Sequence, residues 1–153
     1  MAKILIIDDD ALIRMQTKKL LKDNGFEVNV AENGKIGLQM AHKLLPDLII
    51  CDVNMPILNG YDVLKKLKNS TRTKSIPFIF YSSDVSYENL RKGMLLGADD
   101  YLLKPIQTNE ILFSITNQLE KSNVKKEQTQ IKQIKTFRKI SRNFRIALTA
   151  RFI

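Results

Sequence analysis

The chain has 153 residues, of which 44% are hydrophobic and 27% charged, a composition typical of a soluble globular protein. Its apolar runs have the length of strands, far below the roughly 20 residues that a membrane-spanning helix needs. One cysteine and one histidine exclude an internal disulfide and a zinc site. Because the first residues also lack the pattern of a signal peptide, we expect a cytoplasmic protein.

The net charge of +9 is concentrated at one end of the chain. Residues 1–120 contain 15 Lys/Arg and 15 Asp/Glu, so this part is neutral. Residues 121–153 contain 10 Lys/Arg and one acid, which accounts for the whole excess of +9. A basic character therefore belongs to the last part of the chain and says nothing about the rest.

The first 120 residues alternate between short apolar runs and stretches with helical periodicity. In chain order, strands are predicted at 3–7, 28–31, 48–51, 77–81 and 101–103, and helices at 11–24, 34–45, 61–68, 87–96 and 109–120. Alternation of this kind is typical of an α/β protein with a doubly wound parallel sheet and helices on both faces. The runs LIIC and PFIFY have no polar alternation, which fits strands covered on both sides.

Polar side chains follow four of the predicted strands. Asp8 and Asp9 follow the first, Asp52 the third, Ser82 and Ser83 the fourth, and Lys104 the fifth. Because the carboxyl ends of parallel strands meet at one edge of the sheet, we expect these groups to share one crevice. Carboxylates gathered there repel one another unless a cation joins them, and a set of hard oxygen ligands favours Mg²⁺.

Such a site has the parts for phosphoryl transfer. Asp52 stands alone after its strand and is the best candidate nucleophile toward phosphorus, whereas the adjacent Asp8 and Asp9 look like metal ligands. The backbone carbonyl of Asn54 could complete the metal shell, and the ammonium of Lys104 could hold a phosphoryl oxygen. In the loop that follows Asp52, Gly60 is predicted to supply a backbone angle that other residues disfavour.

The chain resembles the response-regulator receiver domains of bacterial two-component signalling, chemotaxis receivers among them. The resemblance covers residues 2–121 and rests on ILIIDDD, CDVNMPILNGYD, FYSSD and GADDYLLKPI, which occur in order. It implies a flavodoxin-like five-stranded sheet of order 2-1-3-4-5 with five helices.

The resemblance also implies the role of each site residue. Asp52 accepts a phosphoryl group from a histidine kinase or phosphotransfer protein, and Asp8, Asp9, Asp52 and the Asn54 carbonyl bind Mg²⁺, Asp8 through water. Ser82 is the switch hydroxyl, Lys104 contacts the phosphate, and Tyr101 is the aromatic side chain whose rotamer follows activation. The bond between Lys104 and Pro105 is cis in the family. By this resemblance the chain is a signalling receiver that catalyses only its own phosphorylation and dephosphorylation.

A rival interpretation is a phosphatase or phosphotransferase that uses an aspartyl phosphate on a similar sheet. Such an enzyme needs a second acid two residues after its nucleophile. Asn54 occupies that position and cannot titrate, which argues against turnover of an external substrate. A second rival is binding to a membrane or to nucleic acid through the basic end of the chain.

Residues 122–153 are interpreted as a basic, helical amphipathic tail or linker that follows the five helices, or as an output segment cut short. From Ile131 to Leu148, apolar residues recur every three or four positions with basic residues between them. Pairing with itself or a partner, or binding to an anionic membrane surface, would suit this pattern. Nucleic acid suits it less, because so short a segment has no supporting domain. Ser114 argues against self-association through the last helix of the receiver-like part, because family members that pair in this way carry an arginine at this position.

Overall fold

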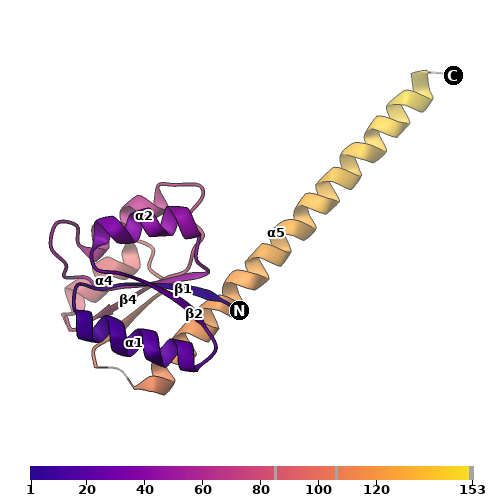
Figure 1. Ribbon diagram of the computed structural model, residues 1–153. Helices are drawn as coiled ribbons and strands as arrows, with labels where there is room; N and C mark the ends of the chain where they lie inside the picture. Colours follow the sequence, from indigo (N-terminus) through magenta and orange to yellow (C-terminus); the bar gives the residue numbers. More distant parts are fainter. Residues whose placement is uncertain (85, 106, 152–153) are drawn as a thin grey trace. The chain divides into compact units, whose positions relative to one another are not determined.

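The computed structural model describes residues 1–84, 86–105 and 107–151, so the last two residues of the predicted tail lie outside it. In the described part, five parallel strands form one sheet in the order β2-β1-β3-β4-β5 (Figure 1). The strands are β1 (Lys3–Ile7), β2 (Glu27–Ala31), β3 (Leu48–Cys51), β4 (Phe78–Ser82) and β5 (Asp100–Leu103). The helices are α1 (Ala11–Asp23), α2 (Gly34–Leu44), α3 (Gly60–Lys68), α4 (Tyr87–Leu95) and α5 (Thr108–Arg151). The predicted fold class and strand order are confirmed.

Two apolar clusters lie on opposite faces of the sheet, because alternate strand residues point to opposite sides. On one face, Ile4, Ile6 and Ile50 pack with Leu21 of α1 and with Ile111 and Ile115 of α5. On the other face, Leu5, Ile7 and Ile49 pack with side chains of α2 and α3. Helices α1 and α5 thus share one face, and α2 and α3 lie on the other.

Helix starts agree with the local sequence. Asp10 caps α1 by accepting hydrogen bonds from the amides of Leu12 and Ile13 at 2.9 and 3.1 Å, and Asn33 accepts from Ile36 at the start of α2. A side-chain oxygen at this position satisfies amides that have no partner within the helix. The Asp10 cap fixes where α1 begins, and so it fixes the position of the acidic segment between β1 and α1.

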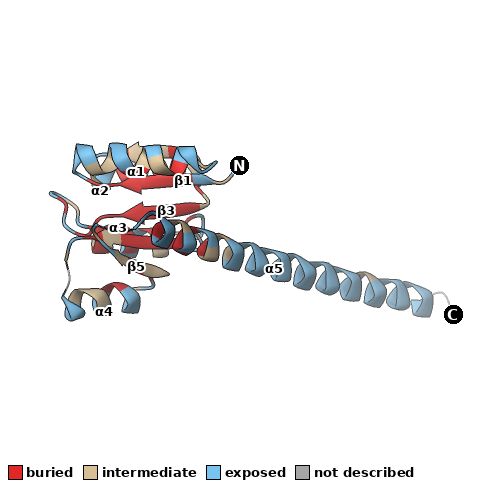
Figure 2. Cartoon of the chain, turned by 90° about the horizontal axis from the view of Figure 1, so that it is seen from below, coloured by how far each residue is buried: buried red, intermediate tan, exposed pale blue. Residues whose placement is uncertain are grey.

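The predicted helical tail is confirmed. The helix predicted at 109–120 and the tail form one continuous helix, α5, which runs to Arg151. Residues 108–151 contain neither glycine nor proline, so no residue type in this stretch breaks a helix. The chain divides into two compact units, Met1–Leu119 and Glu120–Ile153. In the first unit α5 buries Ile111, Ser114, Ile115 and Gln118, whereas the described residues of the second unit are almost all exposed (Figure 2).

Candidate functional site

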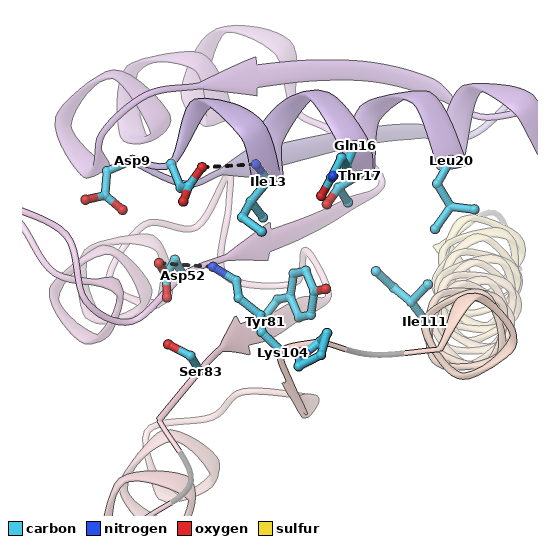
Figure 3. Close-up of a pocket in the computed structure, with 12 residues that line it drawn as sticks. Asp9, Ile13, Gln16, Thr17, Leu20, Asp52, Tyr81, Ser83, Lys104 and Ile111 are labelled. Carbon is cyan, nitrogen blue, oxygen red and sulfur yellow. Dashed lines mark hydrogen bonds and ion pairs between the residues drawn. The ribbon is translucent and has the colours of Figure 1, made fainter.

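The candidate site lies where β1, β3 and β5 end. Asp8 is 2% exposed and Asp52 8% exposed, so two carboxylates are buried close together. The ammonium of Lys104 lies between them, 2.7 Å from an Asp8 oxygen and 3.3 Å from an Asp52 oxygen. Figure 3 shows the Lys104 side chain extending across the crevice to Asp52. Three residues separated by up to 96 positions are thereby joined into one ion cluster, and their expected proximity is observed.

Each carboxylate is held by the backbone as well. The amide of Asp10 donates to Asp8 at 2.9 Å, and the amide of Val53 donates to Asp52 at 2.7 Å. One Asp52 oxygen is thus fixed by the amide, while the other faces Lys104. Because the Lys104 ammonium is a point charge on a flexible stem, it can move from a carboxylate to an incoming phosphoryl oxygen.

The electrostatics of the cluster show partial compensation. Burial raises the pKa of the Asp52 carboxyl; the Lys104 charge opposes that rise, and Asp8 adds to it. For Lys104, burial alone would lower the pKa, but the hydrogen bond to Asp8 and the charge of Asp52 outweigh burial and raise it. Lys104 is therefore held as a cation, and one positive charge balances only one of the two buried carboxylates.

The acidic residues fit a divalent cation. Asp8, Asp9 and Asp52 each offer an oxygen atom, and these atoms lie within 4.8 Å of one another. Asp9 is exposed, so one ligand faces solvent and gives an ion a route to the site. Asn54 is also exposed and lies in the loop after Asp52. Three carboxylate oxygens are hard donors of the kind that Mg²⁺ prefers.

The loop after Asp52 returns closely on itself at Gly60. The amide of Gly60 donates to the carbonyl of Val53 at 2.8 Å, and a Cβ at residue 60 would lie 2.1 Å from the Asp52 carbonyl oxygen. The prediction that Gly60 adopts an unusual backbone angle was wrong, since among the described glycines positive φ occurs at Gly25 and Gly97 but not at Gly60. Glycine is needed here because no side chain fits against the backbone of Asp52.

The predicted switch residues lie side by side in the interior. Ser82 is fully buried at the end of β4, and its hydroxyl accepts a hydrogen bond from the amide of Asp84 at 3.2 Å. Tyr101 is 7% exposed, and its hydroxyl donates to the carbonyl of Asp84 at 3.4 Å. Burial raises the pKa of the Tyr101 hydroxyl, and the neighbouring Ser82 hydroxyl opposes this rise. In this structure the aromatic side chain therefore occupies an inward position.

An aromatic cluster surrounds Tyr101. The ring centroids of Phe80 and Tyr101 are 5.6 Å apart, and those of Phe80 and Tyr61 are 5.3 Å apart. The hydroxyl of Tyr61 donates to the carbonyl of Asn89 at 3.0 Å, so α3 is tied to α4. Tyr61 directly follows the loop between Asp52 and Gly60, and Phe80 lies between it and Tyr101.

A pocket of about 740 Å³ opens beside the carboxylates. Asp9, Asp52, Ser83 and Lys104 line its polar part, while Ile13, Leu20 and Ile111 come from α1 and α5 (Figure 3). Ser83, not Ser82, lines the pocket. The peptide bond between Lys104 and Pro105 is cis, as the resemblance implies.

Two contributors were missed by the sequence analysis. The guanidinium of Arg14 donates to the backbone carbonyl of Asp8 at 2.7 Å and so braces the acidic segment from α1. The Lys104 ammonium lies 5.3 Å from the ring centroid of Tyr81. Arg14 lies outside the stretches that carry the resemblance, and Tyr81 lies within one, FYSSD, which does not reveal its contact with Lys104. Both residues act through the tertiary position of their helix or strand.

Comparisons with known proteins agree with this site. Residues 4–116 match the model of the response regulator receiver domain. The chain is 35% identical over 128 residues to a protein from Pyropia yezoensis described as the probable transcriptional regulator ycf29. It is also 36% identical over 113 residues to Protein PilG of Pseudomonas aeruginosa.

A solved structure of the chemotaxis protein CheY4 of Vibrio cholerae superposes with a TM-score of 0.73 at 33% identity and covers 76% of this chain and 98% of CheY4. The fold and the family match define a receiver domain. The chain belongs to the response regulator receiver domain family of two-component signalling, in which phosphorylation and Mg²⁺ binding are general properties.

The coverage differs between relatives. The alignments cover 84% of this chain and 58% of ycf29, against 74% of this chain and 84% of PilG. The chain therefore spans somewhat more than half the length of one curated relative and most of the length of another. In the described part of the chain, no helix has the length and apolar character needed to cross a membrane.

Proposed function

We propose that the chain is a phosphoacceptor switch in which Asp52 receives a phosphoryl group from the phosphohistidine of a histidine kinase or phosphotransfer protein. The observation that carries this proposal is the ion cluster, in which one Asp52 oxygen is held by the Val53 amide and the other faces a mobile ammonium. A nucleophile with one fixed and one available oxygen, beside a cation that can follow the transferred group, suits phosphoryl transfer.

The proposed step is a simple displacement. An Asp52 oxygen forms a bond to phosphorus, the phosphorus–nitrogen bond of the donor breaks, and the imidazole nitrogen keeps the electron pair and takes up a proton. Lys104 then contacts a phosphoryl oxygen, while Asp8 and Asp9 remain available as metal ligands. A Mg²⁺ held by Asp8, Asp9, Asp52 and the Asn54 carbonyl would neutralise charge on the phosphoryl oxygens.

A phosphoryl group on Asp52 would give the Ser82 hydroxyl, at the end of β4, a new hydrogen-bond partner. Ser82 is fully buried at the end of β4, and its hydroxyl accepts a hydrogen bond from the amide of Asp84. On phosphorylation the Ser82 hydroxyl would donate to the phosphoryl group and favour the inward position of Tyr101. The change is a shift between two populations of one fold, and a partner that recognises the surface near α4 and β5 would read it.

The first test is phosphorylation of Asp52→Asn. Incubated with Mg²⁺ and a small acyl phosphate or a phosphorylated donor, the wild-type chain should carry a labile phosphate on Asp52. The variant should fold, as checked by circular dichroism, and take up no phosphate. The matched control Asp62→Asn, which removes a carboxylate from the first turn of α3, should be phosphorylated normally. Normal labelling of Asp52→Asn would refute the assignment.

We propose that residues 1–121 act as the receiver domain and that 122–153 serve a separate role as a tail or truncated output segment. All the proposed site residues precede Pro105, and the family model ends at residue 116. Removal of 122–153 should therefore leave the rate of Asp52 phosphorylation unchanged. Unfolding of the shortened chain in circular dichroism would show that the tail belongs to the core.

The downstream partner is proposed to be a protein. Pairing through the last helix of the receiver is disfavoured by Ser114, which is 3% exposed and donates to Asp100 at 2.5 Å. This hydrogen bond engages a carboxylate that would otherwise be available to a second receiver. Turnover of an external phosphate ester is also disfavoured, because Asn54 offers no acid or base.

A further inference from the structure

The second unit, Glu120–Ile153, presents two distinct faces along one helix. At about 100° per residue, five apolar side chains fall within about 120° of arc. We call this the apolar face: Ile134, Phe137, Ile140, Phe144 and Leu148. Six basic side chains fall within about 140° on the other side. We call this the basic face: Lys132, Lys135, Arg138, Lys139, Arg142 and Arg145.

Among the described residues of the second unit, 120–151, none covers the apolar face. Phe137 is 72% exposed and Phe144 is 65% exposed. Gln133 and Ser141 are the polar residues on this side, so the face is otherwise a continuous stripe. Large aromatic side chains in such positions are costly to leave in water, because burial of their apolar surface is favourable. An occupant that covers the stripe is therefore expected.

A second copy of the helix fits the stripe poorly. Residues 128–151 contain seven Lys/Arg and no Asp/Glu, so two such helices would repel along their whole contact. A heptad repeat with Ile131 at position a and Ile134 at position d places Arg138, Ser141 and Arg145 in the seam between the two helices. A heptad that starts at Phe137 gives only about two repeats, fewer than the three or four that indicate a coiled coil.

Nucleic acid would interact with the basic face but not with the apolar face. A polyanion would neutralise the basic residues but leave the two phenylalanines in water. An anionic membrane surface satisfies both faces, since the apolar side enters the acyl boundary and the Lys/Arg side chains extend to the headgroups. We propose that residues 131–148 bind the surface of a membrane that contains anionic phospholipids, with the helix in the plane of the interface.

The helix would thereby position the receiver beside the membrane without crossing it. No acid lies on the bound segment, so the attraction comes from the headgroup charge and the apolar face together. Residues 1–120 are neutral and add no general attraction. This inference does not depend on Asp52 as phosphoacceptor, and the two can fail separately.

The test uses the full chain and vesicles of phosphatidylcholine with or without phosphatidylglycerol, measured by co-sedimentation at low and high salt. The chain should bind the anionic vesicles, lose affinity as salt rises, and fail to bind pure phosphatidylcholine. Arg138→Gln with Arg142→Gln should weaken binding about 30-fold, since each basic residue near the surface contributes about a fivefold factor. The matched control Lys65→Gln with Lys66→Gln removes the same charge from α3 and should leave binding unchanged.

The apolar face is tested with a tryptophan reporter, because the chain contains no tryptophan. Emission from Phe144→Trp should shift to shorter wavelength on anionic vesicles, whereas Ile146→Trp, on the basic side, should shift less. Phe137→Ser with Phe144→Ser should weaken binding about tenfold or more, while Ile146→Ser should not. The proposal would be overturned if the chain did not bind vesicles, or if the tryptophan shifts at 144 and 146 were equal. It would also be overturned by dimerisation in sedimentation that Phe137→Ser abolishes, or by tight binding to duplex DNA that the serine variants leave unchanged.

Discussion

Lys104→Met tests the ion cluster most directly, because it removes the cation and keeps the length of the side chain. The side chains of Lys104, Asp8 and Asp52 are only 12%, 3% and 11% exposed, so two carboxylates would remain buried without compensation. Breaking a buried pair in this way costs roughly 3–5 kcal/mol. Because the adjoining pocket admits water and screens the charges, we expect a loss of about 2–3 kcal/mol in unfolding free energy at neutral pH without Mg²⁺.

The pH dependence of this loss has a definite sign. The pKa of Asp52 is already raised by burial in the presence of Lys104, and removal of the cation raises it further. A carboxyl whose pKa is higher in the folded than in the unfolded state takes up its proton first in the folded state, so acidification favours folding. The deficit of Lys104→Met should therefore shrink between neutral pH and about pH 5, where an ordinary aspartate is still ionised.

The assay is urea denaturation followed by circular dichroism at several pH values. Lys66→Met, which removes an exposed lysine of α3, is the matched control and should change stability little. The double variant Lys104→Met with Asp52→Asn should recover part of the loss, as should added Mg²⁺. If Lys104→Met is as stable as Lys66→Met at neutral pH, then Lys104 does not compensate the repulsion between the Asp8 and Asp52 carboxylates.

Three further predictions concern the metal, the switch and the loop. Asp9→Ala should weaken Mg²⁺ binding strongly in calorimetry and raise the stability of the metal-free fold by less than about 1 kcal/mol, since Asp9 is exposed; unchanged Mg²⁺ affinity would misplace the metal. Ser82→Ala should accept phosphate on Asp52 but give a smaller change in the NMR signal of the Tyr101 ring, and an undiminished change would argue against this path. Gly60→Ala should cost about 1–3 kcal/mol in urea denaturation and slow phosphorylation, because its Cβ would lie 2.1 Å from the Asp52 carbonyl oxygen; wild-type stability and rate would contradict the close approach.

Much of the fold follows from local sequence. Short apolar runs and helical periodicity predicted all five strands, and the predicted starts of the first two helices agree with the caps that Asp10 and Asn33 form in the structure. The placement of Asp8, Asp52 and Lys104 at strand ends was enough to predict that they meet, because parallel strands deliver their carboxyl ends to one edge. The sequence by itself thus determined the architecture and the composition of the ion cluster.

Other features were decided only by tertiary structure. Glycine is required at residue 60 because the loop brings its backbone against Asp52. A glycine in a sequence does not reveal whether its backbone angle or the lack of room for a side chain requires it. The brace from Arg14 and the inward position of Tyr101 depend on how helices and strands pack, since neither residue has a local pattern that fixes its partner. The tail was predicted to be helical, but only the structure shows that it continues the helix begun at Thr108 without a break. A polar stretch without glycine or proline has no signal to end a helix that packing has already begun.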